Sequence, residues 1–228
     1  MVVGNGLLAG LFKEYSDIND IIIFASGVSN SSEINEKEFQ REKLLIHKYS
    51  SKYQKKLFVY FSTCAFYDKY FSATLYLDHK ESIEEFISKS FSNYIIFRVP
   101  QIIGSFNKNQ LLGYINHQIQ HNKKFVLYDI ERNLIDLNYV FKVVNYVLKF
   151  NFSKNCIFNI AFPYNITVVE IVKIFEKIYG TNGIYEIKKM DGSFNIDNSK
   201  LLNVYNKLNL ITPHYYEEKI KFYYGQGL

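Results

Sequence analysis

Apolar residues in the first part of the chain alternate between short continuous runs and longer stretches with helical spacing. The continuous runs end at polar or glycine positions, which is typical of strands buried on both faces of a sheet. They lie at residues 2–3, 21–25, 56–62 and 94–99. Three stretches have the apolar stripe of helices. The first ends near residue 15, and the other two cover residues 36–48 and 75–90. This alternation predicts an α/β fold with a doubly wound, Rossmann-like parallel sheet.

The alternation becomes less regular beyond Gly104. Helical stretches follow near residues 109–121, 139–149, 168–179, 199–207 and 215–224. Short strands are predicted near residues 125–128, 156–160 and 185–188. We interpret residues 1–104 as a truncated dinucleotide-binding core, whose sheet later strands can complete. We interpret residues 105–228 mainly as a small α+β cap lobe that binds substrate.

Composition narrows the class of protein. The 228 residues are 48% hydrophobic and 18% aromatic, which suits one compact globular unit. The formal charge of +5 is spread along the chain without a basic arm, so we expect no nucleic-acid partner. No apolar run approaches the ~18 residues of a membrane span, and the N-terminus lacks the basic region of a signal peptide. We therefore expect a cytoplasmic protein with no membrane partner.

Cysteine and histidine spacing gives no metal or disulfide signal. Cys64 and Cys156 are too few and too far apart for a disulfide framework, and a reducing compartment suits them. The pair His117 and His121 lacks the third ligand and the acidic residue of a zinc site, so we predict no metal. Cys64 is interpreted as a small buried filler rather than a reactive thiol.

A glycine turn follows the first apolar run directly. The spacing Gly4-x-Gly6-x-x-Ala9 lets the first glycine make the turn, the second admit a pyrophosphate, and the small third residue pack helix on strand. An ordinary strand-to-helix turn is the alternative. The Asp or Glu that usually reads the adenosine ribose ~20 residues later is missing, because that position falls inside the apolar run at residues 21–24.

A tyrosine, a lysine and a threonine suggest proton and hydride transfer. Tyr76 and Lys80 lie four residues apart on one helical face, where the ammonium is expected to lower the pKa of the phenol. Thr63 ends the preceding strand, where side chains of an α/β sheet point into the ligand crevice. The trio suits proton transfer coupled to hydride transfer to a nicotinamide. In a chain with 20 tyrosines such a pair also arises by chance, but its place after the strand end favours catalysis.

The order of these motifs resembles the extended short-chain dehydrogenase/reductase family, the NAD-dependent epimerases and dehydratases of nucleotide sugars. Besides the glycine turn, the resemblance is carried by Ser62-Thr63-Cys64-Ala65-Phe66-Tyr67, Tyr76-Leu77-Asp78-His79-Lys80, Arg98-Val99-Pro100-Gln101-Ile102-Ile103-Gly104, Arg132-Asn133-Leu134-Ile135-Asp136 and Phe158-Asn159-Ile160-Ala161. It implies Thr63, Tyr76 and Lys80 as the catalytic trio and NAD or NADP as the cofactor.

The resemblance also implies binding positions and a partner. Gln101 stands where the family usually has an Asn that contacts the sugar nucleotide, and Arg132 matches an arginine that grips the nucleotide diphosphate. Arg98 is expected to fix its strand end instead. Family members commonly form homodimers through helices that include the one bearing the tyrosine. The implied cofactor-binding residues are Gly4, Gly6, Ala9, Ala25, Ser26, Gly27, Ser62, Tyr76 and Lys80.

Three departures from the family pattern limit what the resemblance implies. Between Ala9 and Ile21 the chain has one helix, whereas the family inserts two more strand–helix units that carry the adenosine-binding acid. The segment from Thr63 to Tyr76 is shorter than usual. Cys64 and Ala65 replace the acidic pair of the 4,6-dehydratases, which favours epimerisation or simple redox chemistry over elimination.

His79, next to Lys80, faces about 100° away from it and is interpreted as a surface or core residue.

Two functions remain open from the sequence. The first is an NAD(P)-dependent epimerase or oxidoreductase that acts on a nucleotide-linked sugar for surface polysaccharide precursor synthesis. The second is a non-catalytic nucleotide-sugar-binding or regulatory module that has lost dinucleotide binding.

Overall fold

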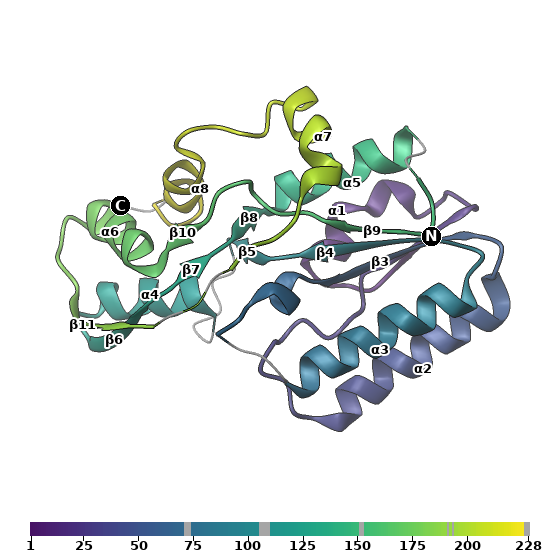
Figure 1. Ribbon diagram of the computed structural model, residues 1–228, viewed down its shortest axis with the longest axis horizontal. Helices are drawn as coiled ribbons and strands as arrows, with labels where there is room; N and C mark the ends of the chain where they lie inside the picture. Colours follow the sequence, from purple (N-terminus) through teal and green to yellow (C-terminus); the bar gives the residue numbers. More distant parts are fainter. Residues whose placement is uncertain (71–73, 105–109, 151–152, 191, 193, 226–228) are drawn as a thin grey trace.

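The computed structural model describes residues 1–70, 74–104, 110–150, 153–190, 192 and 194–225. A five-stranded sheet runs through one half of the molecule, and each strand is parallel to its neighbours (Figure 1). Its strands, in spatial order, are β1 (Val2–Val3), β2 (Ile21–Phe24), β3 (Leu57–Thr63), β4 (Asn93–Val99) and β9 (Cys156–Asn159). The predicted α/β class with a parallel sheet is confirmed.

Helices cover both faces of this sheet (Figure 1). One face is covered by α2 (Glu36–Tyr53) and α3 (Leu75–Ser90). The other face is covered by α1 (Leu7–Leu11), the 3₁₀ turn η1 (Lys13–Tyr15) and α5 (Leu137–Lys149). The fifth strand and α5 both come from beyond residue 104, so the sheet draws on both of the predicted segments.

Alternating side chains of β2 fix which helix lies on which face. Ile22 and Phe24 are fully buried in a cluster with Ile46 of α2 and residues of α3. Ile23, between them, is fully buried on the opposite face in a cluster with Phe12. The chain therefore crosses from β1 to β2 over one face and from β2 to β3 over the other.

A second lobe lies beside the carboxyl ends of the central strands (Figure 1). It contains α4 (Leu111–Gln120), α6 (Val168–Tyr179) and α8 (Tyr215–Tyr224). Its strands pair as β6 (Lys124–Asp129) with β11 (Ile184–Lys189), β7 (Glu131–Arg132) with β10 (Ile166–Thr167), and β5 (Gln101–Ile103) with β8 (Leu134–Asp136). Two further turns of helix, η3 (Ser199–Leu201) and α7 (Leu202–Lys207), follow β11.

Most predicted helices are found close to their predicted limits. The predictions for 75–90, 168–179 and 215–224 match α3, α6 and α8 end to end. The prediction for 36–48 was too short, because α2 continues to Tyr53. Its last turns carry polar residues that hide the pattern, although Tyr49 and Tyr53 pack against the core.

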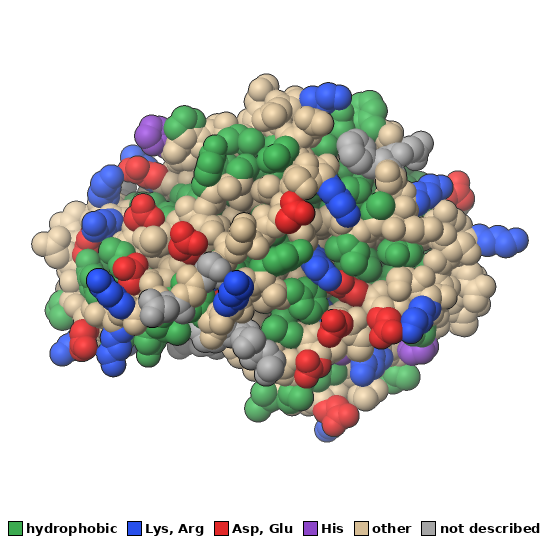
Figure 2. Space-filling model, viewed as in Figure 1, with side chains coloured by type: hydrophobic (Ala, Val, Ile, Leu, Met, Phe, Trp, Pro, Cys, Tyr) green, Lys and Arg blue, Asp and Glu red, His purple; other side chains and the backbone are tan. Residues whose placement is uncertain are grey.

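The surface carries charges of both signs. Figure 2 shows Lys and Arg side chains intermingled with Asp and Glu side chains over the face in view. In the described parts of the chain, no helix combines the length and the apolar character needed to cross a bilayer.

Candidate active site

The glycine turn after β1 has the backbone that its sequence predicts. Gly4 has φ of +125°, and a Cβ there would collide with the carbonyl oxygen of Ala25, so only glycine fits. Gly6 caps α1 and has no atom within 4 Å of the place a Cβ would occupy. Ala9, on α1, is buried. The turn is thus exposed on one side and packed against the end of β2 on the other.

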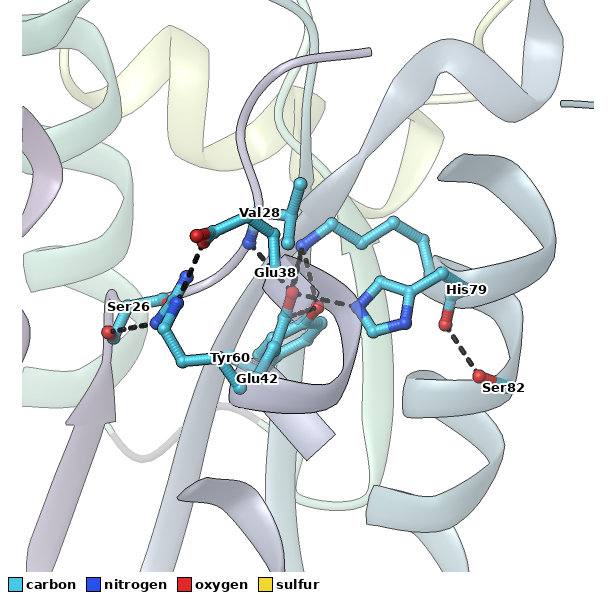
Figure 3. Close-up of polar contacts among 9 residues, drawn as sticks. Ser26, Val28, Glu38, Glu42, Tyr60, His79 and Ser82 are labelled. Atoms are coloured by element: carbon cyan, nitrogen blue, oxygen red, sulfur yellow. Dashed lines mark hydrogen bonds and ion pairs between the residues drawn. The ribbon is translucent and has the colours of Figure 1, made fainter. Parts of the chain in front are cut away.

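The loop after β2 carries three more of the predicted cofactor residues. Ala25, Ser26 and Gly27 are each half-buried. Arg41 of α2 donates hydrogen bonds from Nη1 to the carbonyl oxygen and to Oγ of Ser26, at 3.0 and 3.2 Å. The loop is therefore held on the same helix that covers one face of the sheet (Figure 3).

Thr63 and Tyr76 come together at the end of β3. Thr63 is the last residue of β3, and Tyr76 lies in the first turn of α3. Both side chains are buried, and the Thr63 hydroxyl lies close enough to the phenol of Tyr76 to influence its pKa. Thr63 Oγ1 also accepts a 3.0 Å hydrogen bond from the backbone N–H of Ala65. The shorter segment between them therefore does not separate the two groups.

The expected lowering of the Tyr76 pKa is wrong. Burial raises the pKa of Tyr76 to about 12, and the negative charge of Glu42 adds to this, while the Thr63 hydroxyl opposes it. Lys80 does not offset these effects, although its Nζ lies 5.8 Å from the centre of the Tyr76 ring. Its charge is already engaged elsewhere.

Lys80 lies in a buried ion pair with Glu42. Its Nζ is 3.2 Å from Oε1 of Glu42 and donates a 2.8 Å hydrogen bond to the hydroxyl of Tyr60. Both charged side chains are almost fully buried, with exposed fractions of 2% and 0%. Sequence analysis missed Glu42, although it lies at helical spacing between Phe39 and Ile46, on the apolar face of α2.

The Glu42 carboxylate receives hydrogen bonds from four groups (Figure 3). Besides Lys80, it accepts from the backbone N–H of Val28 at 2.7 Å and from the Tyr60 hydroxyl at 2.6 Å, and Nε2 of His79 lies 2.9 Å away. Burial opposes the charge, but these partners outweigh it and hold the pKa of Glu42 at about 2. His79 was interpreted as a surface or core residue, and it is a core residue. Its polar contact with Glu42 was not predicted.

Three further residues, Arg98, Cys64 and Ser62, lie beside the ends of β3 and β4. Arg98 forms a fork with Glu84, at 3.0 and 2.6 Å, so it fixes the strand end as expected. Cys64 is fully buried and burial raises the pKa of its thiol, which confirms the filler interpretation. Ser62 Oγ is buried and has no hydrogen-bond partner among the described residues.

The two predicted substrate residues lie in the second lobe. Gln101 begins β5, half-buried. Arg132 ends β7, and its Nη1 lies 3.1 Å from Oδ2 of Asp68, which follows the turn after Thr63. The guanidinium also lies over the ring of Tyr70, 5.7 Å from its centre. Asp68, which sequence analysis did not single out, thus balances the charge of Arg132.

Within the described ranges there is no group of three His, Cys, Asp or Glu side chains placed to hold a metal ion.

Comparison with known proteins identifies the fold. No protein-family model and no curated protein matches the chain. Solved structures do match, with TM-scores of 0.71 for the UDP-glucose 4-epimerase of Thermus thermophilus in complex with NAD, 0.72 for the Bordetella bronchiseptica enzyme WbmG in complex with NAD and UDP, and 0.70 for RMD from Pseudomonas aeruginosa complexed with NADPH. The chain has the fold of the extended short-chain dehydrogenase/reductase enzymes.

The likeness covers nearly the whole chain but is distant in sequence. In all three comparisons 97% of this chain is covered, and the match spans 83%, 79% and 86% of the three enzymes. The identities are 11%, 13% and 14%, so the likeness concerns the fold. It confirms the resemblance at that level.

Proposed function

We propose that the chain is an NAD(P)-dependent epimerase or oxidoreductase that acts on a nucleotide-linked sugar, in surface polysaccharide precursor synthesis as the resemblance implies. The observation that carries the proposal is the buried pair of hydroxyl groups, Thr63 and Tyr76, brought together at the end of β3. This pair lies in a fold whose solved relatives include a UDP-glucose 4-epimerase with NAD and an enzyme with NAD and UDP. In this proposal residues 1–104 bind the dinucleotide and residues 105–228 mainly the sugar nucleotide, and a homodimer is the assembly.

Two features of the chain fit a dinucleotide cofactor. The glycine turn leaves open space beside Gly6, where a phosphate can approach the backbone. Ser62 Oγ is a buried hydroxyl without a partner in the described structure, as expected of a group reserved for a ligand. The remaining residues that we assign to the cofactor are Gly4, Ala9, Ala25, Ser26, Gly27, Tyr76 and Lys80. When bound, the nicotinamide supplies or accepts a hydride.

The chain's own residues then handle the proton. A phenol with a pKa of about 12 is protonated at neutral pH, so Tyr76 is ready to donate a proton to the carbonyl oxygen of a keto sugar. The Thr63 hydroxyl, beside the phenol, holds the same oxygen. Both groups are buried, and the exclusion of water strengthens each of these hydrogen bonds. The protonated phenol favours the reductive direction of the chemistry.

We assign Gln101 and Arg132 to the sugar nucleotide. A guanidinium is planar and binds a diphosphate through two parallel hydrogen bonds, which a lysine cannot do. Because Asp68 pairs with Arg132, a diphosphate has to compete with this carboxylate or bind beside it.

A second candidate is the non-catalytic nucleotide-sugar-binding module. The engagement of Lys80 by Glu42 and Tyr60 favours it, because the ammonium has protein partners where a catalytic lysine needs a ligand. The edge position of β1 favours it as well, since in the described sheet no strand lies on the side where the ribose-binding acid belongs.

Replacement of Tyr76 tests the catalytic proposal. Tyr76→Phe removes the proton donor and keeps the ring, so we expect turnover to fall ~100- to 10,000-fold while nucleotide-sugar affinity stays nearly unchanged. Tyr128→Phe, at a half-exposed position in the second lobe, serves as the control. Unchanged turnover in Tyr76→Phe would refute the assignment.

Calorimetric titration separates the two candidates. NAD, NADP and a panel of nucleoside diphosphates are titrated into the unmodified protein. Binding of a dinucleotide supports the enzyme. Binding of a nucleoside diphosphate without any dinucleotide binding supports the module.

A further inference from the structure

Glu42 joins three elements that border the candidate active site. It lies on α2, and its four hydrogen-bonding partners come from the loop after β2, from β3 and from α3. The side chains of His79 and Lys80, consecutive on α3, both turn toward this one carboxylate. A buried carboxylate is energetically costly unless it is fully hydrogen-bonded. The four hydrogen bonds of Glu42 offset this cost and hold its carboxylate in one position among its partners.

The loop after β2 depends on this carboxylate. The backbone N–H of Val28 donates to Oε2 of Glu42. Gly27 packs so closely that a Cβ at that position would lie 2.8 Å from both Oε1 of Glu42 and Nζ of Lys80. The segment from Ser26 to Val28 is thus laid directly over the ion pair, and its position is set by the pair.

The same carboxylate sets the position of Lys80. Its Nζ has Glu42 and the Tyr60 hydroxyl as partners and lies against the ring of Tyr76. Burial lowers the pKa of Lys80. The Glu42 carboxylate is the largest opposing influence, Glu84 also opposes the shift, and the charge of Arg41 adds to it. Without the Glu42 carboxylate, the buried ammonium loses the counter-charge that contacts it directly, and its neutral form is favoured.

We propose that Glu42 is a positioning residue of this site: it holds the ammonium of Lys80 beside the Tyr76 ring and holds the Ser26–Val28 loop where the dinucleotide binds. The proposal rests on the proposed function for its catalytic consequence. Its structural part, the hold on Lys80 and on the loop, is measurable without turnover.

The first test compares Glu42→Gln with Glu85→Gln. The control removes an equivalent carboxylate from an exposed ion pair with Lys89 on α3. Hydrogen exchange at Val28 and the ¹⁵N signal of the Lys80 ammonium, assigned by its loss in Lys80→Met, report the hold directly. In Glu42→Gln we expect exchange at Val28 to rise at least about tenfold and Lys80 to titrate at lower pH, with neither change in the control. Unchanged exchange and an unchanged Lys80 signal would overturn the proposal.

The second test measures kinetics of the same variants on the nucleotide sugar. Displacement of the site by a fraction of an ångström lowers kcat, so we expect a fall of roughly 10- to 100-fold with KM for the sugar changed less than about threefold. The pH profile of kcat should gain the Lys80 titration. Loss of stability with kcat and the pH profile intact would mean a structural role only and would overturn the proposal.

Failure of the proposed function gives a different pattern. If the unmodified chain neither turns over a nucleotide sugar nor binds a dinucleotide, the proposed function is refuted, and the exchange and ¹⁵N results decide alone whether Glu42 holds Lys80 and the loop.

If Glu42→Gln does not fold, Glu42→Asp replaces it, since it keeps the charge but is one methylene too short to reach all four partners. It should show reduced kcat with an unshifted pH profile, and kcat at the level of the unmodified protein would overturn the proposal.

Discussion

Glu42 ties the acid stability of the protein to its candidate active site. The pKa of its carboxyl is about 2 in the folded chain, against 4.5 for an unperturbed glutamate. A depressed folded pKa contributes stability that is present above pH 4.5 and is lost as the pH falls toward 2. We expect Glu42 to contribute about 3 kcal/mol across this window. Urea unfolding at pH values from about 6 down to about 3 measures it.

The matched variant shows whether this loss belongs to Glu42. Glu42→Gln should be less stable than the unmodified protein near neutral pH, and its stability should depend less on pH below 4.5. Glu85→Gln, which removes an exposed carboxylate, should follow the unmodified protein. If the unmodified protein and Glu42→Gln lose stability in parallel as the pH falls, the acid sensitivity comes from other groups.

Gly27 offers a second test at the scale of one residue. A Cβ there would lie 2.8 Å from two side-chain atoms, and neither can move away cheaply because both belong to the buried ion pair. Gly27→Ala should therefore destabilise the protein by about 1–3 kcal/mol in chemical denaturation. Gly10→Ala is the control: it lies within α1 with open space around it, and it should stabilise by about 0.5–1 kcal/mol. Equal effects of the two substitutions would contradict the crowding at Gly27.

The sequence predicted a contact between residues that are close along the chain and missed a contact between residues that are far apart along it. The contact of Thr63 with Tyr76 follows from motif order and a short connection. The contact of Glu42 with Lys80 joins residues 38 positions apart, and nothing in the local pattern pairs one glutamate with one lysine in a chain with many of each. The pKa of Tyr76 was therefore assigned the wrong direction, because its sign depends on burial and on this unseen partner.

Among the elements, those with a long hydrophobic period were predicted, whereas the two-residue strands were not, except β1, which the glycine turn after it marks. Helix α3 has 16 residues and α6 has 12, enough turns to show an apolar stripe, and both were predicted at their observed limits. Strands such as β7 and β10 have two residues each, too few for any period to appear. These strands exist because tertiary pairing supplies their hydrogen bonds.

The first two connections of the sheet differ in hand. The β1–β2 and β2–β3 connections step in the same direction across the sheet but pass over opposite faces, so they have opposite hands. Nearly all such connections between parallel strands are right-handed. The unusual hand of the β1–β2 connection is explained if α1 once led to strands on the far side of β1, as the resemblance to longer enzymes implies. The remaining sheet stays coherent because β1 still pairs with β2.

For the whole molecule, the ion pair of Asp68 and Arg132 joins the two lobes. Asp68 follows the turn after β3, Arg132 lies on β7 of the second lobe, and both side chains are largely buried. The pair therefore lies where a nucleotide sugar would contact both lobes in the proposed function. The same contact stabilises their arrangement and occupies the guanidinium assigned to the diphosphate.

Removing the competing carboxylate tests that assignment. Asp68→Asn abolishes the charge but keeps the Oδ1 atom that accepts from the backbone N–H of Tyr70, so the local turn is retained. We expect UDP to bind roughly three- to tenfold more tightly in calorimetry, because Arg132 no longer has to leave a carboxylate to bind a diphosphate. Glu131→Gln removes a neighbouring charge without touching this pair and should change the affinity less than about twofold. Weaker or unchanged UDP binding in Asp68→Asn would mean that Arg132 joins the lobes and does not bind the diphosphate.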